Sequence, residues 1–212
     1  RIIIMKIIAL RHGLRFDSAL YFTPLTAEGL VQADNLVEIL KDENIDTIYC
    51  SPFLRTLQTI YPFCIENNKK VKVENTFYEC LGSSEFNYYN YRHSPRELNN
   101  TYPHLSSIID HNYNSQLFVS NISYTETSDK VRNRVFPFIH NLCQKYKKTD
   151  KVFLIVTHGT IVNAIKKYFD KKVHYRENVV EAKPYIIDVP PDIRGPHEYY
   201  EEPSANVQSK IE

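Results

Sequence analysis

Residues 2–13 read IIIMKIIALRHG, an almost unbroken apolar run that leads directly into an Arg-His-Gly triplet. A run this rich in isoleucine is typical of a central parallel strand buried on both faces, because an edge strand would alternate apolar and polar residues. Residues 151–159, KVFLIVTHG, repeat the arrangement with a second His-Gly pair. Ligands bind at the carboxyl ends of strands in open α/β sheets, so both histidines are expected at one functional edge.

The rest of the chain alternates between extended and helical patterns. Besides the strands over 2–10 and 151–156, we predict strands over 46–50, 70–73 and 185–189. Helical patterns occupy 26–41, the segment from 51 onward, 127–148 and 159–169. This alternation predicts an α/β fold, a three-layer sandwich with a mostly parallel central sheet.

Local signals mark the first two helices. Thr26 is placed to cap the helix over 26–41. We expect one apolar face of that helix to be buried, with Leu30, Ala33, Val37 and Leu40. Ser51 and Pro52 are predicted as the N-cap and first helical position of the second helix, which Pro62 is expected to kink or end.

Residues 83–125 show neither the apolar periodicity of a helix nor that of a strand. The stretch is rich in Asn, Ser and Tyr, and a loop of this length in a compact domain is usually a functional cap or poorly ordered. We therefore predict a single domain over 1–189, with 83–125 as a cap-like insertion, and a C-terminal extension over 190–212. The determinants of substrate choice are expected within the insertion.

The composition excludes several classes of protein. The formal net charge is +1, so no global field favours nucleic acid or an anionic membrane. No apolar run approaches the roughly 20 residues that span a bilayer. Four cysteines form no Cys-x-x-Cys pair, which favours reduced thiols in a cytoplasmic protein. We expect no nucleic-acid or membrane partner, and the sequence is compatible with a homodimer.

Three arginines accompany the histidines. Arg11 adjoins His12, Arg15 lies three residues beyond it, and Arg55 falls in the first turn of the predicted second helix. A guanidinium matches the geometry of phosphate oxygens, and a helix N-terminus attracts anions. The pattern therefore indicates a phosphate site, although spacing alone leaves open that Arg55 is a solvated surface residue.

Four segments, in order along the chain, resemble the signatures of branch 1 of the histidine phosphatase superfamily. This group includes the cofactor-dependent phosphoglycerate mutases and related phosphatases. The segments are Leu10-Arg11-His12-Gly13, PLTAEGLVQA at 24–33, SPFLRTLQT at 51–59, and Val156-Thr157-His158-Gly159. Together they lie within residues 8 to about 165, and the resemblance implies a phosphoglycerate mutase-like sandwich.

The resemblance implies roles for individual residues. His12 would be the nucleophile that becomes phosphohistidine, and Arg11, Arg55 and His158 would hold the phosphoryl oxygens. Glu79, in the segment FYECLG at 77–82, matches the proton donor. The substrate-binding set implied in this way is Arg11, Gly13, Arg15, Asp17, Arg55, His158 and Gly159.

The assignment of Glu79 stays open, and Arg15 and Asp17 differ from the family's common pattern. Glu85 lies close to Glu79 and remains an alternative proton donor. Arg15 and Asp17 give an Arg-His-Gly-x-Arg-x-Asp arrangement, which resembles the phosphatase domain of the ubiquitin-associated, SH3-containing T-cell regulators. Arg15 would supply a further cation to the phosphate.

The expected chemistry is phosphoryl transfer, which asks a protein mainly for positioning and for neutralisation of charge. A neutral imidazole at His12 is a competent nucleophile near pH 7. His158 would act protonated, as a cation beside the transferring group, and a protonated Glu79 would supply the leaving oxygen with a proton. We expect no metal and no other cofactor, because the acidic residues and histidines show no metal-ligand spacing.

The sequence thus predicts a phosphatase that hydrolyses phosphate monoesters, with a small-molecule phosphate ester or a phosphopeptide as substrate. One alternative is a cofactor-dependent phosphoglycerate mutase, in which a bound phosphoglycerate replaces water as the second acceptor. A second alternative is a catalytically inactive interaction module. The presence of all five expected catalytic residues disfavours it; these are Arg11, His12, Arg55, Glu79 and His158.

Overall fold

A computed structural model of the chain describes residues 4–82, 95–123 and 125–196. Its sheet has five strands in the order β3-β2-β4-β1-β5. Their bounds are β1 Met5–Arg11, β2 Thr47–Cys50, β3 Val71–Val73, β4 Val152–Thr157 and β5 Pro184–Val189. In the described sheet β5 runs antiparallel to β1 and the other pairings are parallel. The predicted strands and the mostly parallel sheet are confirmed.

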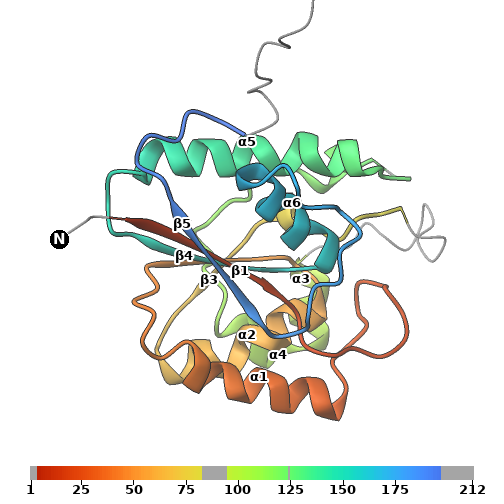
Figure 1. The fold of residues 1–212 in the computed structure, drawn as a ribbon. Helices are drawn as coiled ribbons and strands as arrows, with labels where there is room; N and C mark the ends of the chain where they lie inside the picture. The colour runs from red at the N-terminus through yellow and green to blue at the C-terminus, as the bar shows by residue number, and fades with distance from the viewer. Residues whose placement is uncertain (1–3, 83–94, 124, 197–212) are drawn as a thin grey trace, which may run out of the picture.

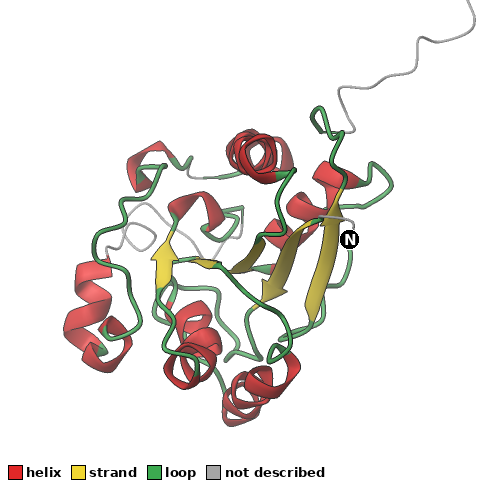
Figure 2. Cartoon of the chain, turned by 90° about the vertical axis from the view of Figure 1, so that its left-hand side faces the viewer, coloured by secondary structure: helices red, strands yellow, loops and turns green. Residues whose placement is uncertain are grey.

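Helices cover both faces of the sheet (Figures 1 and 2). The helices α1 (Ala27–Ile39) and α2 (Leu54–Glu66) lie on one face, and α5 (Ser128–Tyr146) and α6 (Gly159–Phe169) lie on the other. Shorter helices are η1 (Asn75–Phe77), α3 (Pro95–Thr101), α4 (Pro103–Ser106) and η2 (Val119–Asn121). Within the described residues, no helix combines the length and the apolarity that a membrane crossing requires.

Alternate side chains of β1 enter two separate cores, because successive residues of a strand point to opposite faces. Ile8 and Leu10 pack in the core beneath α1 and α2. Ile7 and Ala9 pack in the core beneath α5 and α6. The strand is therefore buried on both faces, as its composition predicts, and the three-layer sandwich is confirmed.

The buried face of α1 differs from the expected one. Ala33 and Leu40 are buried as predicted, Val37 is half-buried, and Leu30 is 46% exposed. Gly29 and Leu36 take its place on the buried face. Gly29 can lie on the buried face because it has no side chain, and its backbone packs against Leu14 in the loop that follows β1.

The predicted start of α2 is wrong. The helix begins at Leu54, and its N-cap, Phe53, has no side-chain capping bond. The hydroxyl of Ser51 lies 2.9 Å from His158 Nε2 instead, so it serves the histidine rather than the helix. Pro62 does not end the helix, which continues through it. Burial of the apolar face of α2 offsets the cost of an interior proline, about 3 kcal/mol.

The loop that follows β1 is fastened to both helices of its face. The backbone N–H of Gly13 donates to Thr59 Oγ1 at 2.9 Å, and that of Leu14 donates to Gln32 Oε1 at 2.7 Å. A Cβ at Gly29 would lie 2.0 Å from the carbonyl oxygen of Leu14, so only glycine fits there. The segments 24–33 and 51–59 therefore both hold this loop in place, through Gln32 and Gly29 in the first and Thr59 in the second.

Candidate active site

The two His-Gly pairs are neighbours because β1 and β4 are adjacent and in register. Arg11 is paired with Thr157 across the two strands. One residue further on, the N–H of His12 donates to the Thr157 carbonyl at 2.9 Å. The ring centroids of His12 and His158 are 5.3 Å apart, and both residues are buried. The structure thus brings both histidines together at the edge that the strand pattern indicated.

His12 is fixed in one orientation by its own loop. Its Nδ1 lies 2.7 Å from the carbonyl oxygen of Gly13. A carbonyl only accepts, so Nδ1 carries the proton and Nε2 keeps its lone pair. Burial lowers the pKa of His12 well below its usual value, and the positive charges of Arg55 and His158 lower it further. The imidazole is therefore neutral at neutral pH.

The carboxylate of Glu79 contacts both Arg55 and His158. Its Oε2 lies 3.2 Å from Arg55 Nη2 and 3.1 Å from His158 Nδ1. Its Oε1 accepts from the N–H of Cys80 at 2.9 Å. The side chain of Arg55 is fully buried, whereas that of Glu79 is 16% exposed. Arg55 is therefore not the solvated surface residue that spacing alone could not exclude.

The pKa shifts of Glu79 and His158 set the protonation of this cluster in the ligand-free protein. Burial opposes ionisation of Glu79, but the charges of His158 and Arg55 outweigh it and lower its pKa below the usual range. Burial lowers the pKa of His158 to about 4 despite the opposing effect of Glu79. At neutral pH in the ligand-free protein Glu79 is therefore a carboxylate and His158 is neutral; the protonated forms expected from the sequence belong to the complex with substrate.

A cavity of about 390 Å³ opens in front of His12. The described residues that line it are Arg11, His12, Arg15, Glu79, Gly159, Thr160 and 175–179. Gly159 begins α6, so the N-terminus of an 11-residue helix faces the cavity, where it attracts anions. The lining thus combines an imidazole, a carboxylate, arginines and a helix N-terminus.

The two arginines near His12 are already engaged. Arg11 Nη2 forms an ion pair with Glu181 at 2.9 Å, and its Nη1 donates to the Val179 carbonyl at 2.6 Å. Arg15 Nη1 donates to the carbonyl oxygens of Phe16 and Ser18. Both guanidiniums line the cavity from these positions. These ion-pair and hydrogen-bond contacts fix the positions of both side chains at the cavity.

Four of the predicted substrate-binding residues are not among the described residues that line the cavity: Gly13, Asp17, Arg55 and His158. Arg55 and His158 contact Glu79, which does line it. Asp17 is exposed and is not among the residues that line the cavity. Gly13 contributes through its backbone: its carbonyl orients His12, and a Cβ on it would lie 2.8 Å from the Gly29 carbonyl oxygen. Glu85, the alternative proton donor, lies outside the described residues.

Sequence reasoning missed the segment between α6 and β5. Tyr175, Arg176, Glu177, Asn178 and Val179 line the cavity. No pattern in that segment indicated a site, since the pairing of β5 with β1 is what brings it to this edge. The described residues of 83–125 do not line the cavity, and residues 83–94 and 124 of the expected cap lie outside the described residues.

The donor atoms of the cluster are close enough to hold a metal ion. Ligand atoms of His12, Glu79 and His158 lie within 4.8 Å of one another. Arg55 Nη2, however, lies 3.2 Å from Glu79 Oε2 and 3.3 Å from His158 Nδ1. A fixed positive charge at that distance repels a divalent cation and attracts an anion. The cluster is therefore better suited to a phosphate than to a metal.

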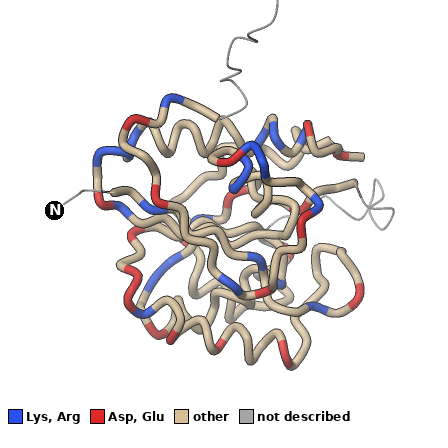
Figure 3. Tube along the Cα trace, in the orientation of Figure 1, with Lys and Arg blue, Asp and Glu red and all other residues tan. Residues whose placement is uncertain are grey.

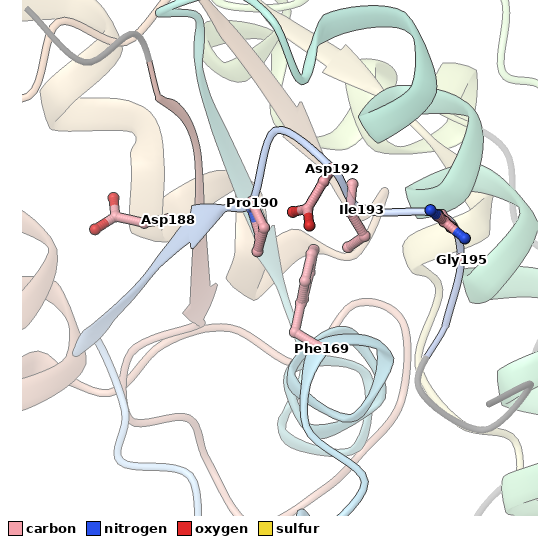
Figure 4. A pocket seen from close by; sticks show the side chains of 7 residues that line it. Phe169, Asp188, Pro190, Asp192, Ile193 and Gly195 are labelled. Atoms are coloured by element: carbon pink, nitrogen blue, oxygen red, sulfur yellow. The ribbon is translucent and has the colours of Figure 1, made fainter. Parts of the chain in front are cut away.

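The positive charge at the site is local. In the view of Figure 3, segments with Lys or Arg and segments with Asp or Glu are interspersed along the described chain. A larger cavity, of about 620 Å³, lies near the opposite end of β1, where Asp188 pairs with Lys6. Phe169, Pro190 and Ile193 give it apolar surface and Asp192 a carboxylate (Figure 4). It holds no pair of nucleophile and base.

Several solved structures have a similar fold, and some of them are described as phosphatases. A putative alpha-ribazole-5'-phosphate phosphatase from Escherichia coli superposes with a TM-score of 0.60 at 21% identity, covering 87% of this chain and 90% of the other. Mycobacterial glucosyl-3-phosphoglycerate phosphatase gives a TM-score of 0.59 at 16% identity, covering 85% and 88%. YhfR of Bacillus stearothermophilus gives 0.59 at 19% identity, covering 86% and 90%. At these identities the likeness establishes the fold.

Sequence comparison identifies the family. The mouse ubiquitin-associated and SH3 domain-containing protein B is 30% identical over 151 residues, which are 66% of this chain and 22% of the mouse protein. The chain thus spans about a fifth of the length of that relative. The model of the histidine phosphatase superfamily (branch 1) matches residues 7–177, which include both His-Gly pairs and Glu79. The chain belongs to branch 1 of the histidine phosphatase superfamily.

Proposed function

We propose that the chain is a phosphatase that hydrolyses phosphate monoesters and carries the phosphoryl group on His12. The observation that supports this most is the state of His12. It is buried and neutral, its Nδ1 is held by the Gly13 carbonyl at 2.7 Å, and it borders a cavity lined by arginines. An imidazole in this state offers Nε2 as an oriented nucleophile, without a base to activate it.

In the first step Nε2 of His12 attacks phosphorus, a P–N bond forms and the ester P–O bond breaks. Arg15, Arg55 and the N-terminus of α6 neutralise charge on the equatorial oxygens. A glutamic acid at position 79 gives its proton to the leaving oxygen. The alcohol departs and the phosphoryl group stays on His12.

The proton on Glu79 arrives with the substrate. In the free protein Glu79 is ionised, because Arg55 and His158 stabilise its negative charge. A phosphate dianion beside the cluster reverses that balance and raises the pKa of both Glu79 and His158. A phosphate monoester has a second pKa of about 6, so its monoanion carries the proton that Glu79 receives.

In the second step water attacks the phosphohistidine, and the carboxylate of Glu79 takes the proton of that water. The P–N bond breaks, inorganic phosphate leaves, and Nε2 regains its lone pair. Hydrolysis, rather than transfer to a second phosphoglycerate, is supported by the similar structures described as phosphatases. The segment 175–179, which lines the cavity, would contact the leaving group of a small phosphate ester or a phosphopeptide.

The covalent step predicts where label accumulates. Rapid quench with 32P-labelled substrate should trap phosphate on His12, stable in alkali and labile in acid. His12→Ala should lose both the label and turnover, whereas His111→Ala, at an exposed histidine, should keep both. Chelators should leave activity unchanged, because no step uses a metal. Label on a cysteine, or normal turnover by His12→Ala, would overturn the mechanism.

The role of Glu79 predicts a dependence on the leaving group. An alkoxide needs a proton as it leaves, whereas nitrophenolate does not. Glu79→Gln should therefore lower kcat/KM for glycerol 2-phosphate at least about tenfold more than for p-nitrophenyl phosphate. kcat/KM is the appropriate measure because it reports the first phosphoryl transfer. If Glu85→Gln shows this pattern and Glu79→Gln slows both substrates equally, the proton donor is Glu85.

Ligand binding should raise the pKa of His158. The value in the free protein is about 4, because burial disfavours the charged ring. An added phosphate supplies negative charge, so the ring should protonate at a higher pH. NMR titration of the imidazole Cε1–H signals, with and without saturating inorganic phosphate, measures this, and His158→Asn assigns the signal. A pKa that does not move at saturation contradicts the proposed electrostatic coupling.

A further inference from the structure

A buried ion pair that the mechanism does not use lies behind Glu79. Arg134, on α5, forms two parallel bonds with Glu126: Nε to Oε1 at 2.7 Å and Nη2 to Oε2 at 2.9 Å. The two side chains are only 6% and 2% exposed. Burying such a pair costs desolvation energy that its own attraction barely recovers, so stability alone is a weak reason for its presence.

The remaining donors of Arg134 bind the backbone of the segment that carries Glu79. Nη1 donates to the Thr76 carbonyl oxygen. Nη2 donates to the carbonyl oxygens of Tyr78 at 2.9 Å and of Glu79 itself at 3.3 Å. One guanidinium therefore spans three carbonyl groups within four residues. A point charge such as an ammonium could not make this set of bonds.

Glu126 holds the same segment from its other end. The N–H of Leu81 donates to Glu126 Oε2 at 3.4 Å, and the N–H of Glu126 donates to the Leu81 carbonyl at 3.3 Å. Gly82 packs directly on this residue, since a Cβ there would lie 2.7 Å from the Glu126 carbonyl oxygen. The pair therefore fastens 76–82 on both sides of Glu79.

This fastening matters because residues 78–82 belong to neither a helix nor a strand. Catalytic groups must be held within about 0.5 Å of the productive position, and a displacement of 1 Å can cost about a hundredfold in rate. Glu79 Oε2 must stay within reach of His158 and Arg55, at 3.1 and 3.2 Å. Regular secondary structure does not supply that precision here.

We infer that Arg134, together with Glu126, is a positioning residue for proton donation by Glu79. The inference rests on the proposed function, since it concerns the acid of that same reaction. Arg134 is not among the described residues that line the cavity, and its hydrogen bond to Glu79 is to the backbone carbonyl oxygen rather than to the carboxylate. It acts through the backbone of 76–82, which sets the place of the Glu79 carboxyl relative to the leaving oxygen.

The test uses Arg134→Lys, which keeps the charge opposite Glu126 but loses the forked contacts to the carbonyls. We expect kcat/KM for glycerol 2-phosphate to fall at least about tenfold more than that for p-nitrophenyl phosphate. Labelling of His12 by p-nitrophenyl phosphate should continue. Arg132→Lys, on the same helix and 35% exposed, is the matched control and should leave both substrates unchanged.

A double-mutant cycle separates positioning from general support of the fold. In the Glu79→Gln background, Arg134→Lys should cost no further activity toward the alkyl ester, because the proton it positions is already absent. Glu126→Gln keeps an acceptor oxygen and should show the same selective loss to a smaller extent. If Arg134→Lys does not fold, Glu126→Gln provides the same test. Equal slowing of both esters in the folded variant, or additive losses in the cycle, would overturn the inference.

The outcomes also distinguish this inference from the proposed function. If His12 is not labelled in the wild-type chain, the proposed function fails and this inference fails with it. If His12 is labelled and Glu79→Gln shows the leaving-group dependence, while Arg134→Lys slows both esters equally, only the inference about Arg134 is wrong.

Discussion

The arrangement of the site depends on one fully buried guanidinium. Arg55 Nη2 lies within 3.3 Å of both Glu79 and His158, and Nη1 donates to the Leu20 carbonyl at 2.8 Å. The carbonyl of Arg55 accepts from Thr59 Oγ1, which in turn accepts from the N–H of Gly13. The first turns of α2 thereby connect the loop after β1, the Glu79 segment and the end of β4. Removal of this charge would leave the largely buried carboxylate of Glu79 without its cation, which is destabilising.

The same guanidinium sets the protonation of the resting site. It favours the ionised form of Glu79 and the neutral forms of both histidines. In the ligand-free site the positive charge of Arg55 thus neutralises the negative charge of Glu79. In the proposed mechanism, an anionic substrate would shift the balance toward protonation of Glu79 and His158, so that the acid forms in the presence of a leaving group.

The sequence predicts the parts of the fold that depend on local pattern. The apolar runs before the two His-Gly pairs predicted the strands β1 and β4. Because these parallel strands are adjacent, His12 and His158 lie close together. The start of α2 could not be predicted, because the Ser51 hydroxyl is engaged by a histidine 107 residues away. The same holds for the lining segment 175–179, which reaches the cavity through the antiparallel pairing of β5, and for Arg134, whose three carbonyl partners lie more than 50 residues earlier. These features follow from long-range contacts that no local window contains.

In the proposed mechanism the phosphoryl group passes through the protein rather than directly to water. The most direct measurement is the stereochemical course of transfer from an ester whose phosphorus is chiral through oxygen isotopes to an added alcohol acceptor. Each in-line displacement inverts the configuration at phosphorus. Two displacements, onto Nε2 of His12 and then onto the acceptor, predict overall retention. Overall inversion would mean a single direct displacement and would contradict the account.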